Sequence, residues 1–68
     1  MIASDLLSRV HALGDEWGFR LTYLGRSAGW SVNVNNQRNW FPVYGANLAA
    51  AFEESLSRAE AFVKEGVR

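Results

Sequence analysis

Residues 30–35 read Trp-Ser-Val-Asn-Val-Asn, the most regular alternation of apolar and polar side chains in the sequence. Successive side chains of a strand point to opposite faces of a sheet, so this pattern predicts a strand with one buried and one solvent-facing side. Residues 25–29, Gly-Arg-Ser-Ala-Gly, form a short connection with a glycine at each end. Before it, Phe19, Leu21 and Tyr23 occupy alternate positions. The sequence therefore predicts an antiparallel hairpin with strands over 19–25 and 29–35.

A third strand is predicted over residues 40–44, Trp-Phe-Pro-Val-Tyr. The preceding residues 35–39, Asn-Asn-Gln-Arg-Asn, are of types that favour a turn. Pro42 has no N–H group to donate to a neighbouring strand, and proline within a sheet is confined mainly to edge strands. We therefore expect the third strand to lie at the edge of the sheet.

A helix is predicted before the first strand, over about residues 4–17. Its apolar residues recur at spacings of four, four, three and four, which places them on one face: Ile2, Leu6, Val10, Leu13 and Trp17. Gly14 disfavours the helix by about 1 kcal/mol, so the helix ends either at Leu13 or at Trp17. We favour Trp17, with Gly18 as the left-handed cap, because Trp17 stays in phase with the apolar face.

A second helix is predicted over about residues 47–65. Asn47 is a favourable N-cap, and Gly66 follows the end of the helix. The apolar face has the same spacing as in the first helix: Leu48, Phe52, Leu56, Ala59 and Val63. Two oppositely charged pairs four residues apart, Glu54 with Arg58 and Glu60 with Lys64, are expected on the exposed face.

These elements predict an α+β fold of order αβββα, in which a three-stranded antiparallel meander carries both helices on one face. Residues 1–68 are expected to form one small domain with a thin core. Phe19, Trp30 and Phe52 are in phase with the apolar faces, so we expect them in this core. The sequence has no cysteine and a single histidine, His11, so we expect neither a disulfide nor a metal site.

The sequence offers no convincing catalytic group. His11 lies opposite the apolar face of its predicted helix and is expected to be an ordinary exposed histidine. Asp15 and Glu16 are adjacent, and neighbouring side chains on a helix do not converge on one substrate. Gly25 and Gly29 flank a hairpin and not a strand-to-helix turn, which argues against a phosphate-binding loop. We therefore expect a non-enzymatic protein without a cofactor.

Charge is balanced over the whole chain but uneven along it. Seven basic and seven acidic residues give a formal net charge of zero, which does not favour nucleic acid as a partner. The segment 18–45 nevertheless holds Arg20, Arg26 and Arg38 and no acidic residue. No apolar run approaches the ~20 residues of a membrane span. Asp5 and Arg9 interrupt the apolar region that a signal peptide would need, so we expect a cytoplasmic protein without membrane contact.

The same central segment is rich in aromatic residues. Trp40 and Phe41 are consecutive in a strand and therefore point to opposite faces, with Tyr44 on the side of Trp40. One of the two must face away from the helices, and the sequence leaves open which one does. An exposed aromatic patch on a small protein often marks an interface. The candidate interaction residues are three aromatics and three arginines: Trp40, Phe41, Tyr44, Arg20, Arg26 and Arg38.

The order αβββα over the whole chain resembles the double-stranded RNA-binding domain. The second helix, beginning Asn47-Leu48-Ala49-Ala50-Ala51-Phe52, is similar to the alanine-rich last helix of that family. That family places basic residues at the start of this helix to bind phosphates, whereas this chain has Asn47 and Leu48 there. The resemblance therefore implies the fold and not RNA binding. The chain also has the general look of small accessory proteins encoded by bacteriophages, which implies a host protein as a partner.

We therefore expect a protein-interaction module that binds a partner protein or a second copy of itself as a homodimer. One alternative is a nucleic-acid-binding domain that uses Arg20, Arg26 and Arg38 on the sheet. The other is a self-associating structural domain, in which a two-fold copy covers the exposed aromatics. The sequence does not identify the partner.

Overall fold

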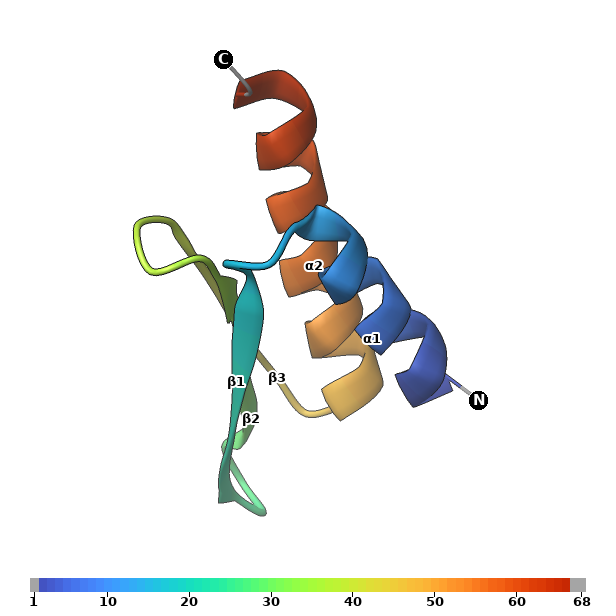
Figure 1. Ribbon diagram of the computed structural model, residues 1–68. Coiled ribbons are helices and arrows are strands. Elements are labelled where there is room, and N and C mark those ends of the chain that lie inside the picture. Colours follow the sequence, from blue (N-terminus) through green and yellow to red (C-terminus); the bar gives the residue numbers. More distant parts are fainter. Residues whose placement is uncertain (1, 67–68) are drawn as a thin grey trace.

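The computed structural model describes residues 2–66 and has the predicted element order (Figure 1). The three strands form one antiparallel sheet of order β1-β2-β3, with β2 in the centre. Both helices lie on the same side of this sheet. The predicted αβββα meander is therefore confirmed. The elements are α1 (Ile2–Leu13), β1 (Gly18–Gly25), β2 (Gly29–Asn35), β3 (Trp40–Gly45) and α2 (Leu48–Gly66).

The first helix ends earlier than predicted, at Leu13 and not at Trp17. Gly14 follows with a φ of 137°, a backbone conformation that glycine adopts readily and other residues rarely do, so it takes the place expected of Gly18. Trp17 lies in the loop before β1, where its ring stacks on Phe41 at a centroid distance of 6.1 Å. The apolar phase of Trp17 therefore reflects its contact with the core and not a helical conformation.

The core lies between α2 and the two strands β2 and β3. Val32, Val34, Leu56 and Ala59 are fully buried, and Phe52 is buried as predicted. Leu6 and Val10 of α1 complete the core, although the side chain of Ile2 lies outside the described part. α1 packs mainly against α2 and has fewer contacts with β1.

Two aromatics that were predicted to be in the core are less covered than expected. Phe19 leans on Phe52, with ring centroids 4.9 Å apart, yet remains 37% exposed. Trp30 is half-buried and packs on Tyr23. The reason is geometric: α2 lies over β2 and β3, and α1 packs beside α2, so neither helix covers the length of β1.

Turns and caps follow local chemistry closely. The Asn47 side chain accepts a hydrogen bond from the Ala50 N–H at 3.0 Å, which confirms it as the N-cap of α2. Gly29 has a φ of 81° and sits against the backbone of Gly45 and Ala46, with no room for a Cβ atom. This glycine is therefore required both by its conformation and by the close approach of β3 to the start of β2.

A fully buried serine joins α2 to the sheet. The Val34 N–H donates to the Ser55 hydroxyl oxygen at 2.9 Å, and that hydroxyl donates in turn to the Phe41 carbonyl. One side chain of α2 therefore satisfies backbone groups of both β2 and β3. Buried polar groups without such partners are costly, so this bridge fixes how the helix sits on the strands.

Removal of the Ser55 hydroxyl should destabilise the fold. In Ser55→Ala the buried backbone groups of Val34 and Phe41 lose their partner, at a cost of about 1–3 kcal/mol. Since 1 kcal/mol shifts the melting temperature of a domain this size by roughly 4–8 °C, thermal unfolding followed by circular dichroism should detect the change. Ser57→Ala is the matched control, because Ser57 is exposed on the same helix and bonds only Glu53. Equal melting temperatures for the two variants would contradict the role given to Ser55.

Candidate protein-binding surfaces

The side of the sheet that faces away from the helices is uncovered, and we call it the outer face. On β3 it presents Trp40, Pro42 and Tyr44, which lie opposite a polar row on β2. The register places Trp40 beside Asn35, and Tyr44 beside Ser31. The outer face therefore has an aromatic row along its β3 edge and hydrogen-bonding side chains through its centre: Ser31, Asn33 and Asn35.

Trp40 is the member of the consecutive pair that faces outward. Its side chain is 53% exposed and that of Tyr44 is 68% exposed. Phe41 points to the helix side, where it contacts Trp17 and lies 5.6 Å from Phe62 between ring centroids. The alternative that the sequence left open is thereby resolved, and Phe41 is removed from the set of exposed candidates.

Hydrogen bonds of Asn33 hold the backbone of β3 next to Trp40. The side-chain amide oxygen of Asn33 accepts the Phe41 N–H at 3.2 Å, and the backbone carbonyl oxygen of Asn33 accepts a bond from the Asn35 side-chain amide at 3.0 Å. These bonds orient the two asparagines on the outer face and tie β2 to β3 beside Trp40. The aromatic row is thus presented by a strand that is fixed from both sides of the sheet, by Asn33 and by Ser55.

The three candidate arginines do not come together. Arg20 lies on the outer face of β1, opposite Asn33. Arg26 lies in the turn between β1 and β2, and Arg38 in the turn between β2 and β3, so they occupy opposite ends of the sheet. Strands of this length span about 20 Å or more, so no continuous basic patch forms from them. None of the three has an ion pair with an acidic residue among residues 2–66.

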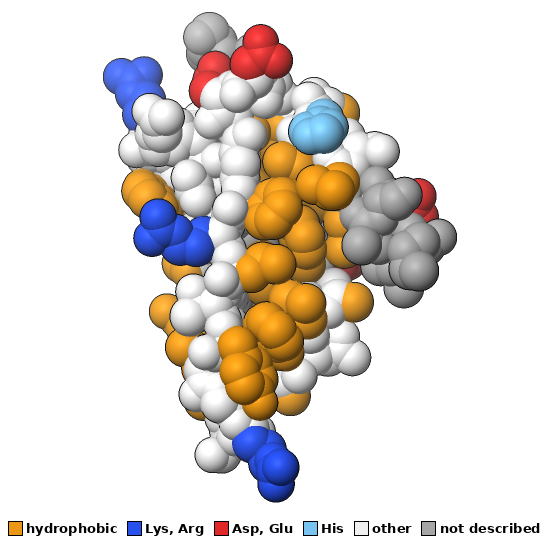
Figure 2. Space-filling view, turned by 60° about the horizontal axis from the view of Figure 1, so that its bottom comes forward, with side chains coloured by type: hydrophobic (Ala, Val, Ile, Leu, Met, Phe, Trp, Pro, Cys, Tyr) orange, Lys and Arg blue, Asp and Glu red, His pale blue; other side chains and the backbone are white. Residues whose placement is uncertain are grey.

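A second exposed surface, which the sequence reasoning missed, follows the helix side of β1. Phe19, Leu21 and Tyr23 point toward the helix side but are 37%, 40% and 59% exposed. Figure 2 shows hydrophobic side chains in a nearly continuous column along this part of the molecule. We call these three residues the β1 column. The alternation in the sequence predicted their direction but could not show that neither helix would cover them.

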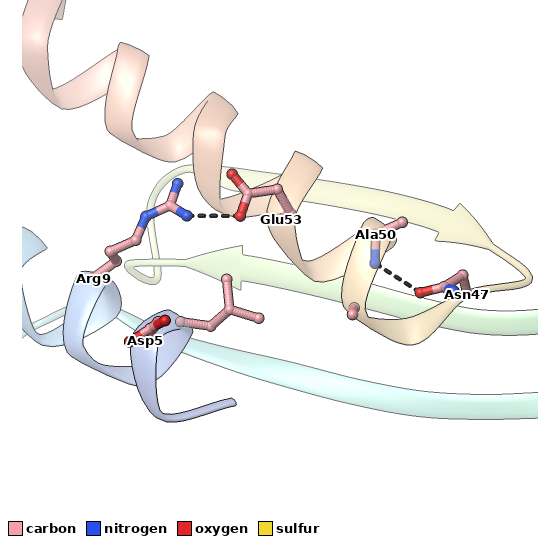
Figure 3. Close-up of a pocket in the computed structure, with 7 residues that line it drawn as sticks. Asp5, Arg9, Asn47, Ala50 and Glu53 are labelled. Atoms are coloured by element: carbon pink, nitrogen blue, oxygen red, sulfur yellow. Dashed lines mark hydrogen bonds and ion pairs between the residues drawn. The ribbon is translucent and has the colours of Figure 1, made fainter. Parts of the chain in front are cut away.

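The two helices meet at an ion-pair cluster centred on Arg9. Its guanidinium donates to both carboxylate oxygens of Glu60, at 2.9 and 2.7 Å, and to Glu53 at 2.7 Å. Figure 3 shows Arg9 reaching across from α1 to Glu53. These two side chains line an open groove of about 510 Å³. Glu60 was predicted to pair with Lys64 but pairs with Arg9. The predicted pair of Glu54 with Arg58 forms, at 2.8 Å. Bidentate contacts of this kind have the most favourable ion-pair geometry.

This cluster changes the titration of Glu53. The hydrogen bond from Arg9 lowers the pKa of the Glu53 carboxyl below its ordinary value of 4.5, and the Ser57 hydroxyl adds to the effect. The same cluster raises the pKa of Arg9, chiefly through the hydrogen bond with Glu60. Both shifts favour the charged forms, so the bond between Arg9 and Glu53 depends on an ionised Glu53 carboxyl.

No cluster of side chains suited to metal binding is found among residues 2–66. His11 is exposed, as predicted, and no group of three or more acidic or histidine side chains there could hold a metal ion. The groove beside Arg9 is open, and its charged side chains Arg9 and Glu53 already bond to each other. Neither described helix is long and apolar enough to cross a membrane. The exposed aromatic surfaces are thus the features that call for a functional explanation.

Comparison with known proteins adds no relative: no protein-family model, no curated protein and no solved structure matches the chain. The function is therefore argued from the surfaces themselves.

The Arg9 cluster predicts loss of stability in acid. Because the folded-state pKa of Glu53 is lowered, its contribution is fully present above 4.5 and is lost as the pH falls through the lower value. We expect the melting temperature of the wild type to fall between pH 6 and pH 3, and Glu53→Gln to reduce that fall. Glu54→Gln, at the exposed pair within α2, should keep the wild-type dependence. A fall of equal size in Glu53→Gln and the wild type would exclude this role for Glu53.

Proposed function

We propose that the chain is a non-enzymatic protein-interaction module that binds a partner protein on the outer face of its sheet. The observation that carries the proposal is the exposure of Trp40 and Tyr44 on either side of Pro42 along β3. Large aromatic side chains on a surface are the usual anchors of protein interfaces. Tryptophan and tyrosine also lose little conformational entropy on binding, since each has only two side-chain torsions.

The surroundings of the aromatic row fit this use. Ser31, Asn33 and Asn35 provide hydrogen-bonding groups next to the anchors, in the manner of a polar rim. Among the strand residues that the structure describes, Arg20 is the one charged residue on the outer face. The partner should accordingly present an apolar or aromatic patch with an acidic group about one sheet-width away. A bacterial host protein is the class that the general resemblance to phage accessory proteins would imply.

Loss of the two exposed aromatics should abolish partner binding without unfolding the protein. Immobilised wild type and a Trp40→Ser, Tyr44→Ser double variant would be compared in affinity capture from bacterial lysate. Proteins retained by the wild type and lost by the double variant would be purified and titrated against both. Leu7→Ser, which removes a similarly exposed apolar side chain from α1, is the control and should retain them. If the double variant retains every captured protein, the outer face is not the binding site.

The alternative of nucleic-acid binding is supported by one observation, the aromatic row opposite a sheet arginine, which could stack on bases. Against it stand the neutral net charge and the separation of Arg26 from Arg38 by the length of the sheet. The first turn of α2, residues 48–51, reads Leu-Ala-Ala-Ala and has no basic residue.

We therefore expect only weak binding to RNA. Fluorescence anisotropy with duplex and single-stranded RNA at physiological salt should give a Kd weaker than about 10⁻⁶ M, as in non-specific binding. Trp40→Ser should leave this weak binding unchanged. Sub-micromolar binding that falls steeply with salt and is lost in Trp40→Ser would favour the nucleic-acid alternative over a protein partner.

A further inference from the structure

The outer edge of β1 is a free sheet edge. β1 is the first strand in the order β1-β2-β3, and among residues 2–66 no hydrogen bond joins the backbone of residues 19–24 to anything but β2. The strand contains no proline or lysine, residues that commonly protect such edges. Its pairing with β2 is irregular between Tyr23 and Gly25, so the regular part of the edge is residues 18–23. The opposite edge, β3, carries Pro42. The two edges of this sheet therefore differ in their capacity to accept another strand.

The exposed side chains on this edge have a symmetric pattern. In the β1 column an aromatic residue precedes and follows a central leucine: Phe19, Leu21 and Tyr23. When two copies of such a strand run antiparallel about a two-fold axis at Leu21, each Phe19 lies opposite Tyr23 of the other copy. Cross-strand pairs of aromatic side chains are among the more favourable contacts in antiparallel sheets.

We propose that two copies of the chain pair through β1, antiparallel and with Leu21 opposite Leu21, to form a six-stranded sheet. The pairing would satisfy the free backbone groups of both edges and shield both β1 columns on the helix side. It uses a different surface from the outer face and so goes beyond the proposed function. The assembly also closes after two copies, because each copy has one open edge and Pro42 discourages addition at the other.

Charge complementarity selects this partner and this direction. Asp15 and Glu16 precede β1, and Arg26 follows it. None of these three forms an ion pair within residues 2–66. Antiparallel pairing of two copies brings the acidic start of one strand beside the basic end of the other, at both ends of the interface. Glu16 and Arg26 lie in the turns that precede and follow β1, so with Leu21 at the axis they would lie near each other at each end of the paired strands.

The neighbouring registers are less favourable. The nearest alternative registers of the two β1 strands that keep every side chain on the same face of the sheet have the two-fold axis one residue away, at Arg20 or at Thr22. At Arg20, the two guanidinium groups would lie directly opposite each other, which is repulsive. At Thr22, Phe19 would lie opposite Gly25 and lose its aromatic contact. The register centred on Leu21 avoids both penalties.

Engineered cysteines test the proposed register directly, since the chain has none of its own. Directly opposed residues of antiparallel strands have Cα atoms about 4.5–5.5 Å apart, within the range that a disulfide spans. Leu21→Cys should therefore form a covalent dimer in a glutathione buffer on non-reducing gels. Phe19→Cys is the matched control, because it lies on the same strand and face with similar exposure and is far from its own copy. Equal cross-linking of the two variants, or none, would overturn the register.

Oligomeric state and charge exchange complete the test. Sedimentation equilibrium of the wild type at micromolar concentration should give twice the chain mass of 7.6 kDa. Glu16→Arg and Arg26→Glu should each weaken the dimer at least tenfold, and the double exchange should restore it.

A variant of the outer face separates this proposal from the proposed function. Tyr44→Lys should leave the dimer intact although it impairs partner capture, so each proposal can fail without the other. A strictly monomeric wild type, or dissociation by Tyr44→Lys alone, would refute the β1 pairing.

Discussion

The buried Ser55 hydroxyl constrains the rest of the architecture. It bonds the backbone of β2 on one side and of β3 on the other, so α2 has a defined position above these two strands. That position determines which face of the sheet is covered. Phe41 is directed toward the helices, and Trp40 is consequently directed to the outer face. The two hydrogen bonds of Ser55, together with the buried valines of β2 and β3, thus fix the sheet face that α2 covers and leave Trp40 and Tyr44 on the other face.

The same position of α2 leaves β1 without cover. α1 could have filled that space, but its Arg9 binds Glu53 and Glu60 and holds it against α2 instead. The sheet therefore has an open face on one side and an open edge strand on the other. If β1 pairs with a second copy, the two outer faces lie on one side of a continuous sheet. A partner would then meet two aromatic rows, and binding both would raise the apparent affinity through effective concentration.

Most of the secondary structure was predictable because it is encoded by local patterns. Strand alternation, the Asn47 cap and the apolar face of α2 all depend on residues close together in the sequence. The direction of each strand residue was also predictable, including that Trp40 and Tyr44 share a side. Which side the helices cover was not, since alternation alone does not choose between Trp40 and Phe41.

The errors concern contacts between distant segments. Trp17 kept the helical phase while lying in a loop, because a side chain can reach the core from either conformation. Glu60 binds Arg9 and not Lys64, a choice made by the packing of α1 on α2. Phe19 was assigned to the core on its alternation, but its exposure depends on where the helices lie over the sheet.

The ion pair between Arg9 and Glu60 joins residues 51 apart in the sequence, and this separation affects the order in which the fold assembles. Closing so long a loop is entropically unfavourable until the intervening chain is structured. During synthesis α1 leaves the ribosome first, yet the surface that receives it is made last. α1 therefore has no α2 to pack against until α2 has been translated.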